Sequence, residues 1–289
     1  MASAVCLFAM HAPDGRLSGA VLHYLGQLAG CGLAVHVALS GMAAMHSQDQ
    51  AALGAIGATG HCRENAGLDF GAWQHLASLG CINNAEFVVL ANDSVFGPLR
   101  PLSPIFSRMQ EIGADVWGMV ESHEVAWHLQ SWFLCFTRAA WNTPAIARVM
   151  ALPYRDMTKR EIVLHGEVGL GAAIRAAGLD WAACQPDHRR GLRKLIATNP
   201  MHLDWLSFVR EGDVPFIKME LLRDNPMLIP WLHRWPAMVG RSAIFRPDWI
   251  RERIVPQEAG QRPSLAMHLL YMMLTRDRPA ALRALWPYR

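Results

Sequence analysis

Short apolar runs alternate with helical patterns from residue 4 to about residue 184, and this alternation constrains the fold more than any other feature of the chain. It is typical of a parallel or mixed sheet with helices on its faces. The expected strands are at residues 4–11, 33–40, 86–91, 115–120, 131–137 and 179–184. The expected helices are at residues 18–30, 48–56, 71–79, 105–112 and 167–177. The fold class is therefore α/β, with a mostly parallel central sheet flanked by helices.

The composition is that of an ordinary globular protein. The 289 residues are 52% hydrophobic and 18% charged, which is enough apolar surface for a large core. A net charge of +3 gives no reason to expect a nucleic-acid partner. The six cysteines are scattered, with no C-x-x-C and no histidine cluster at zinc spacing, which favours reduced thiols in a cytoplasmic protein and gives little support for a structural metal. No window has the roughly 20 apolar residues that a membrane span needs.

The sharpest chemical feature is the end of the expected strand at residues 86–91, where Asn92, Asp93 and Ser94 follow directly. Ligands of α/β sheets bind at such strand ends. Carboxylate, amide and hydroxyl oxygens suit a hard cation such as Mg²⁺ or Mn²⁺, which could bridge the two phosphates of a nucleotide diphosphate. The alternative is a β-turn in which these side chains bond their own backbone.

A second feature is the polar segment at residues 61–69, which leads into an expected helix. Two glycines at its end let the backbone turn tightly and approach a ligand. Arg63 could pair with a phosphate, and Asp69 could bond a ribose, base or sugar hydroxyl. The alternative is an ordinary helix N-terminus, with Asp69 as its cap and Arg63 paired to Glu64 in solvent.

Two later segments carry polar side chains that could bind a sugar hydroxyl or take a proton from one. His128 and Gln130 lie where a polar loop passes into an expected strand, and either side chain suits a sugar hydroxyl. Glu167 follows a glycine at an expected helix start, where a carboxylate can take a proton from an attacking hydroxyl. The alternatives are that His128 has only a structural role and that Glu167 is a first-turn glutamate favoured by the helix dipole.

The last candidates lie between residues 199 and 226. His202 could ligate a metal, while Lys218 and Arg223 could neutralise a leaving diphosphate. The alternative is an amphipathic helix with solvated basic residues.

The chain has no G-x-G-x-x-G after its first strand, no G-x-x-x-x-G-K-[ST] and no G-x-S-x-G. These absences disfavour dinucleotide oxidoreductases, P-loop NTPases and α/β-hydrolases.

Four linked motifs resemble the rhamnan synthesis protein F family. They are Arg63-Glu64-Asn65-x-Gly67-x-Asp69-Phe70-Gly71, Asn92-Asp93-Ser94-x-x-Gly97-Pro98, Asp115-x-Trp117-Gly118 and His128-Leu129-Gln130-Ser131-x-Phe133. The resemblance continues through Glu167-x-Gly169-Leu170 and Asn199-Pro200-x-His202, and it covers about residues 4–230. Members of that family are glycosyltransferases or glycosyltransferase-like proteins of bacterial surface-polysaccharide synthesis, with a GT-A-like, Rossmann-like fold.

The resemblance implies transfer of a sugar, rhamnose or another hexose, from a nucleotide-diphosphate donor to a growing glycan with inversion. In GT-A enzymes an Asp-x-Asp at a strand end holds the metal, and Asn92-Asp93-Ser94 would take that place here. Glu167 would be the base, His128 and Gln130 would orient the sugars, and Asp93 and His202 would be the metal ligands. The implied donor-binding residues are Arg63, Asn65, Asp69, Asn92, Asp93, Ser94, Lys218 and Arg223.

The expected organisation is a GT-A-like domain at residues 1–230 with a helical C-terminal extension at residues 231–289 packed on it. The apolar stretch at residues 265–274 predicts either a core-facing helix or an interfacial helix that meets a lipid-linked glycan acceptor at the inner membrane face. Two other functions stay open. One is a non-catalytic scaffold subunit of a polysaccharide assembly complex, and the other is a hydrolase with Asp69 and Glu167 as paired carboxylates.

Overall fold

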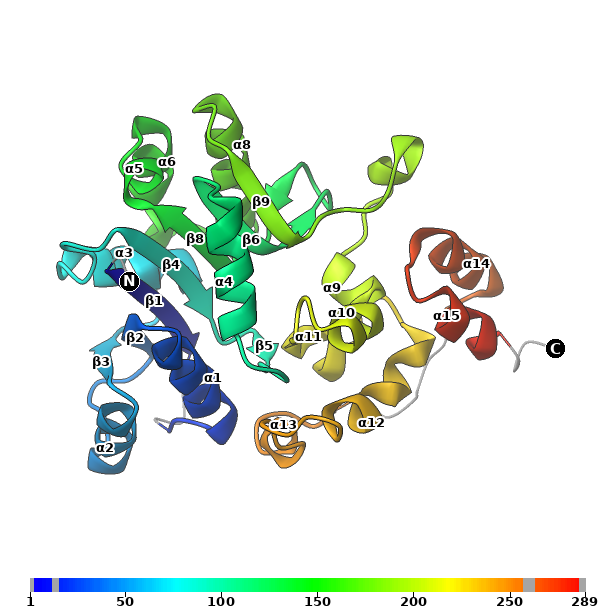
Figure 1. Cartoon of the computed structure of the whole chain (residues 1–289), viewed down its shortest axis with the longest axis horizontal. Helices are drawn as coiled ribbons and strands as arrows, with labels where there is room; N and C mark the ends of the chain where they lie inside the picture. Colours follow the sequence, from blue (N-terminus) through cyan, green and yellow to red (C-terminus); the bar gives the residue numbers. More distant parts are fainter. Residues whose placement is uncertain (1–2, 12–15, 257–262, 286–289) are drawn as a thin grey trace.

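A single eight-stranded sheet forms the centre of the molecule in the computed structural model, which describes residues 3–11, 16–256 and 263–285 (Figure 1). The strand order is β3-β2-β1-β4-β8-β6-β7, and β9 also pairs with β6. All pairings are parallel except those of β8 with β4 and β6 and that of β7 with β6. The strands are β1 (Ala4–His11), β2 (Leu33–Ser40), β3 (Ala58–Arg63), β4 (Phe87–Asn92), β6 (Val116–Ser122), β7 (His128–Leu129), β8 (Phe133–Thr137) and β9 (Trp181–Gln185). The predicted α/β fold with a mostly parallel sheet is confirmed.

Helices cover both faces of this sheet because its central strands are apolar on both sides. On β1, Phe8 and Met10 face one layer, whereas Leu7 and Ala9 face the other. The first layer holds α1 (Gly19–Gly30), α2 (Ser47–Ala55) and α4 (Ser103–Ile112). The second layer holds α3 (Leu68–Ser78), α5 (Arg138–Trp141), α6 (Pro144–Met150), α7 (Lys159–Ile162) and α8 (Val168–Ala176). The two layers leave the carboxyl ends of the parallel strands open.

The predicted strands β1 and β2 and the start of α1 are confirmed; the Ser18 side chain caps α1 by accepting a bond from the Val21 N–H. The structure differs at β3, where sequence analysis expected only a polar segment. This edge strand has half-exposed side chains and no apolar run, so the pairing with β2 determines it. Helix α3 begins at Leu68 rather than residue 71, which brings Asp69 into its first turn.

A second, two-stranded sheet pairs β5 (Val95–Phe96) with β10 (Ile217–Lys218) in antiparallel register. Sequence analysis did not predict either strand, because two residues carry no periodicity. Val95 lies opposite Lys218. The small sheet therefore brings Lys218 to the turn that follows β4.

The remaining helices form a third core beside the sheet domain (Figure 1). They are α9 (Pro200–Leu203), α10 (Trp205–Glu211), α11 (Met219–Arg223), η4 (Pro230–Arg234), α12 (Trp235–Val239), α13 (Asp248–Arg251), α14 (Leu265–Leu274) and α15 (Arg278–Ala284). Buried Trp205 and Leu221 pack with Trp231, Trp235 and Tyr271 in this core. Residues before and after position 230 therefore pack in one apolar core. The domain boundary at residue 230 stays a prediction. Among the described helices, none is long and apolar enough to cross a membrane.

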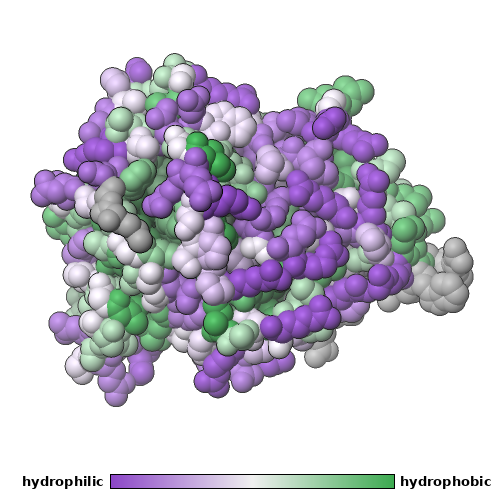
Figure 2. Space-filling view, viewed as in Figure 1, coloured by the Kyte–Doolittle hydropathy of each residue, from purple (hydrophilic) through white to green (hydrophobic). Residues whose placement is uncertain are grey.

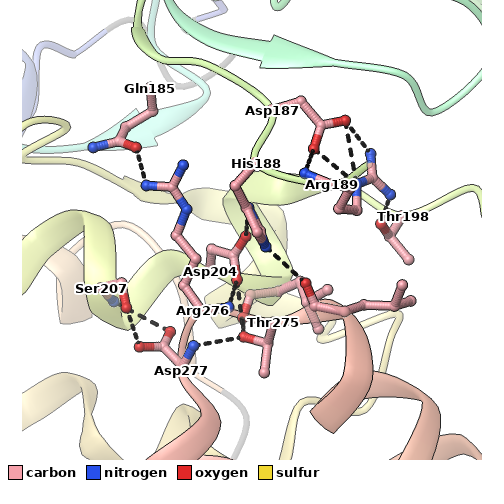
Figure 3. Close-up of polar contacts among 12 residues, drawn as sticks. Gln185, Asp187, His188, Arg189, Thr198, Asp204, Ser207, Thr275, Arg276 and Asp277 are labelled. Atoms are coloured by element: carbon pink, nitrogen blue, oxygen red, sulfur yellow. Dashed lines mark hydrogen bonds and ion pairs between the residues drawn. The ribbon is translucent and has the colours of Figure 1, made fainter. Parts of the chain in front are cut away.

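A buried polar network joins this helical part to the end of β9 (Figure 3). Arg276 bonds the Gln185 side chain at the end of β9 and donates to the Pro186 carbonyl at 3.1 Å. The next residue, Asp277, accepts bonds from the Ser207 backbone N–H (3.1 Å) and hydroxyl (2.6 Å). Arg189 donates to the Thr198 hydroxyl at 2.5 Å and forms an ion pair with Asp187. The bond from Arg189 holds Thr198 in place beside Asn199, the N-cap of α9, which lines the cavity described next.

Candidate functional site

A cavity of about 470 Å³ lies at the carboxyl ends of the parallel strands. The antiparallel strand β8 begins at this same edge, so the segment before it also reaches the cavity. Eight of the residues proposed from the sequence line it, namely Asp69, Asn92, Ser94, His128, Gln130, Glu167, Lys218 and Arg223. The lining also includes Glu124, Ser131, Lys159, Asn199 and Glu220. The expected convergence of distant strand ends is therefore present.

A chain of hydrogen bonds crosses the floor of this cavity. The Asn92 side-chain amide donates to Asp69 Oδ2 at 2.7 Å. Asn92 Oδ1 accepts from the Ser94 backbone N–H (3.1 Å) and hydroxyl (2.6 Å). Lys218 Nζ donates to Ser94 Oγ at 3.2 Å. The turn after β4 thus connects the Asp69 carboxylate of α3 with the Lys218 ammonium of β10 through hydrogen bonds.

Asp93 does not line this cavity. Its carboxylate forms an ion pair with Arg253, which also donates to the Asp93 backbone carbonyl at 3.0 Å. Burial raises the pKa of Asp93, and Arg253 opposes that shift. The side chain proposed as metal ligand and donor contact is therefore engaged by a residue of the C-terminal segment.

The polar groups at this turn do not fit the metal site implied by the resemblance. Asn92 and Ser94 bond each other, and Asp93 is paired with Arg253. His202 is 2% exposed, and its Nε2 lies 3.6 Å from Glu220 Oε2. Burial, with Lys218 nearby, lowers the pKa of His202 to about 4, so its ring is neutral. The Asp93 carboxylate that would share the ion with His202 is turned away to Arg253. Among the described residues, no three histidine, cysteine or acidic side chains gather at ligand spacing in this cavity.

Arg63 and Asn65 also lie outside the cavity lining. Arg63 donates to the Ser40 hydroxyl at 2.9 Å and to the Ala66 carbonyl at 2.6 Å. These bonds tie the ends of β2 and β3 to the turn before α3, whose first turn carries Asp69. Arg63 thus acts on the site by positioning that helix, whereas Asn65 is exposed.

The opposite wall of the cavity holds Glu167 and His128. Glu167 Oε1 accepts the Ser131 backbone N–H at 2.7 Å and lies 3.8 Å from His128 Nε2. His128 Nδ1 lies 2.9 Å from the Ala126 carbonyl oxygen. Since a carbonyl can only accept, Nδ1 carries the proton and Nε2 faces Glu167. Both side chains are therefore held in one orientation.

Gln130 is bonded at both ends of its amide. It donates to Asn199 Oδ1 at 3.0 Å and accepts from the Trp132 indole N–H at 3.0 Å. Asn199 in turn donates to Glu124 Oε2 at 3.2 Å. Gln130 therefore supports the wall of the cavity by fixing its neighbours.

The local geometry of Glu167 depends on a π-helical turn, Val163–Glu167, which joins α7 to α8. Such turns widen a helix and are frequent at functional sites. A Cβ atom on Gly171 would lie 2.5 Å from the Trp127 carbonyl oxygen and 2.9 Å from His128 Cα. Glycine there lets α8 touch the backbone beside β7, which brings Glu167 alongside His128.

The charges in the cavity centre on Lys218. Glu167, Asp69, Glu220 and Glu124 all stabilise its charged form, while burial lowers its pKa. Burial raises the pKa of Asp69 to about 7, with Asp93 adding to the effect and Lys218 opposing it. Burial, with Glu167, also raises the pKa of Glu124. Lys218 is therefore a buried cation with four acidic side chains around it.

Asp69→Asn is expected to stabilise the chain at pH 8 more than at pH 5. The folded pKa of Asp69 is about 7 against an ordinary 3.8, so the folded chain binds the extra proton between these values. The free energy of unfolding therefore falls as pH rises through that window, and asparagine does not titrate. The expected gain at pH 8 is on the order of 1 kcal/mol, or about 2–4 °C. Thermal unfolding at both pH values measures it, and a gain independent of pH would contradict the assignment.

Sequence analysis assigned no role to Glu124, Glu220, Lys159 or Arg253. Glu124 lies in the loop between β6 and β7, where a search of every strand end would have found it. Glu220 and Lys159 lie on short helices whose exposed polar side chains look like ordinary surface residues. No sequence signal marks Arg253, because its contact with Asp93 spans 160 residues.

Comparison with known proteins gives matches in sequence and in structure. A family described as rhamnan synthesis protein F matches residues 39–230. Virulence protein VirA of Vibrio anguillarum (strain ATCC 68554 / 775) is 26% identical over 218 residues, which cover 65% of this chain and 69% of that protein.

Solved structures are more distant. A CMP:2-keto-3-deoxy-manno-octonic acid synthetase complexed with CTP has a TM-score of 0.37 and 13% identity, and the match covers 72% of this chain and 98% of that chain. Mouse xyloside xylosyltransferase 1 in its apo form has a TM-score of 0.37 and 6% identity, with 63% of this chain and 84% of that chain covered. Similarities this low do not bear on function.

Proposed function

This chain belongs to the rhamnan synthesis protein F family, and we propose that it is a glycosyltransferase that moves a sugar from a nucleotide-diphosphate donor to a growing bacterial surface polysaccharide. Family membership supports a glycosyltransferase of polysaccharide synthesis. One observation carries the proposal to this cavity: Asp69, His128, Glu167 and Lys218 come from four separate segments and line a single space of about 470 Å³. A cavity of that size suits a small-molecule ligand.

The proposed reaction uses Glu167 as the general base. Its carboxylate takes the proton of an acceptor hydroxyl while that oxygen forms a bond to the anomeric carbon of the donor sugar. The bond from the anomeric carbon to the diphosphate breaks, the electron pair leaves with the phosphate oxygen, and the anomeric carbon inverts. The Ser131 N–H holds the carboxylate in place for this step.

Cationic groups on the other side of the cavity stabilise the departing diphosphate. Lys218 is fixed at the turn after β4 by Ser94, whereas Arg223 and Lys159 lie near the solvent. A cation placed where negative charge develops lowers the barrier most when it is already held in position. Lys218 therefore contributes more to stabilising the leaving diphosphate than Arg223 or Lys159. Asp69, whose Oδ2 accepts the Asn92 amide, can bond a donor hydroxyl through its other carboxylate oxygen.

A thermal-shift screen of nucleoside diphosphates and nucleotide sugars tests the proposal. At least one donor is expected to raise the melting temperature by several degrees, because ligands that bind only the folded chain stabilise it. Glu167→Gln is expected to keep that shift, since the residue acts on the acceptor. A donor that binds but transfers no sugar to any glycan would favour the scaffold function. A chain that responds to no nucleotide would contradict the donor site.

We also propose that the chain reaches its acceptor at the inner membrane face. Leu192 and Leu195 on η3 (Gly191–Leu195) are 81% and 79% exposed and lie next to exposed Arg190 and Arg193. They form a hydrophobic tip that protrudes at one corner of the molecule (Figure 2). The segment that leads to this tip contacts the end of α14, where His188 Nε2 lies 2.9 Å from the backbone carbonyl oxygen of Leu274.

Helix α14 has apolar side chains on a buried face and on an exposed face. Tyr271 and Leu274 are buried in the third core, whereas Leu265, Leu269 and Met273 are exposed. Exposed apolar side chains beside arginines fit an anionic lipid surface. Removing the segment would break the core, so point substitutions are the better probe.

The double variant Leu192→Ser with Leu195→Ser is expected to lower flotation with vesicles that contain phosphatidylglycerol about tenfold. Each leucine would lose the apolar burial that lipid supplies. Leu79→Ser is the matched control, since Leu79 is 53% exposed at the end of α3. Equal flotation of all three chains, or no flotation of the native chain, would contradict the membrane contact.

A further inference from the structure

Three side chains outside the cavity direct potential metal ligands at one point. His36 lies on β2, His61 lies on the neighbouring edge strand β3, and Cys81 lies in the turn after α3. His36 Nδ1 is 3.2 Å from His61 Nε2, and Cys81 Sγ is 3.9 Å from that same nitrogen. All three donor atoms lie within 4.8 Å of one another. None of these residues takes part in the proposed transfer.

The backbone explains why the two histidines meet. In the parallel register of β2 and β3, His36 pairs with Thr59 and Ala38 pairs with His61. His61 therefore lies two residues further along β3 than the partner of His36. Side chains two residues apart along a strand share one face of the sheet. That face is the one covered by α3, and the turn that ends α3 lays Cys81 over both rings.

Two of the three spacings are close to the edges of a metal tetrahedron, and the third, between His36 Nδ1 and Cys81 Sγ, is within 4.8 Å. Zinc bonds of about 2.0–2.1 Å to nitrogen and about 2.3 Å to sulfur place two nitrogens roughly 3.3 Å apart and a nitrogen and a sulfur roughly 3.6 Å apart. The observed 3.2 Å and 3.9 Å differ from these values by a few tenths of an ångström. A hydrogen-bonded histidine pair alone would not require the thiol to face the same nitrogen.

The protonation states also suit a metal. Burial lowers the pKa of both His36 and His61, and the neighbouring His61 ring lowers the pKa of His36 further. Both rings are therefore neutral near pH 7, which is the form that binds metal ions. The Cys81 thiol is reduced and partly exposed, so an ion can reach it from solution.

We propose that His36, His61 and Cys81 form a binding site for Zn²⁺ or a similar first-row transition metal. The imidazoles bind through His36 Nδ1 and His61 Nε2, and the Cys81 thiol releases one proton as its sulfur bonds the ion. The fourth position faces solvent and takes a water molecule. The ion ties the edge strand β3 to β2 and to the end of α3, the helix whose first turn carries Asp69.

Cobalt titration of the metal-stripped, reduced full chain tests the site, with Co²⁺ as the probe. One equivalent of Co²⁺ is expected to give a thiolate-to-cobalt charge-transfer absorption and the visible bands of a tetrahedral ion, both lost when Zn²⁺ displaces it. Cys81→Ser is expected to abolish the charge-transfer absorption, and Cys81→Ser and His61→Gln to weaken Zn²⁺ binding about tenfold or more. Cys62→Ser is the matched control, because Cys62 is the next residue on β3 and packs on the other face of the sheet.

The melting temperature gives an independent measurement. Zn²⁺ is expected to raise it in the native chain and in Cys62→Ser, but not in Cys81→Ser. Circular dichroism checks that each variant is folded. Absence of the charge-transfer absorption in the native chain, or its survival in Cys81→Ser, would overturn the site. Nucleotide binding and sugar transfer are measured separately, so failure of this inference leaves the proposed function intact.

Discussion

Replacing Glu167 with glutamine is expected to lower the rate of sugar transfer by about 10²–10⁴-fold, the usual contribution of a general base. Glutamine keeps the size of the side chain and an oxygen for the Ser131 N–H, which Glu167 now accepts at 2.7 Å. It cannot take a proton from the acceptor hydroxyl. Initial rates with saturating donor and acceptor measure the loss, and the thermal shift with donor checks that the cavity still binds.

Glu161→Gln is the matched control for this variant. Glu161 lies six residues earlier on α7 and completes the capping box of that helix with Thr158. Glutamine is also accepted in a capping box, so the substitution removes one exposed charge with little effect on the helix. A native rate in Glu167→Gln would remove Glu167 as the base, whereas equal losses in both variants would indicate a general effect on α7 and α8.

Replacing Lys218 with methionine is expected to lower the transfer rate by about 10²–10³-fold, a typical cost for removing one group that stabilises developing negative charge. Methionine fills similar space but leaves four neighbouring carboxylates without their shared cation. The donor diphosphate would then meet net negative charge. Isothermal titration of the donor is expected to show weaker binding, and steady-state rates are expected to show a lower kcat.

Arg223→Met provides the comparison for Lys218→Met. Arg223 is about half exposed and already pairs with Asp224 at 2.7 Å, so its removal is expected to cost much less. Lys218→Arg tests whether charge alone is enough, because its longer planar head cannot keep the contact that Lys218 makes with the Ser94 hydroxyl. Donor affinity and rate that stay native in Lys218→Met would place the diphosphate elsewhere in the cavity.

The sequence by itself determined the fold class and the gathering of the site. Central strands buried on both faces need continuous apolar runs, so β1 and β2 were predictable to the residue. Parallel strands also end at one edge of the sheet, and polar residues that follow such ends must lie near one another. Asn92 and Ser94 follow the predicted strand end at residues 86–91 in this way, whereas Asp69, His128 and Glu167 were assigned to the same site through the family resemblance.

Tertiary structure decided which side chain of each motif faces the cavity. Neighbouring residues in a turn point in different directions, so Asn92 meets Asp69 while Asp93 meets Arg253, which lies 160 residues further along the chain. Short or polar strands such as β10 and β3 have no pattern of their own and form only against a partner. The contact of Lys218 with Ser94 and the meeting of His36 with His61 both depend on those pairings, because only a folded sheet brings such distant residues within hydrogen-bond distance.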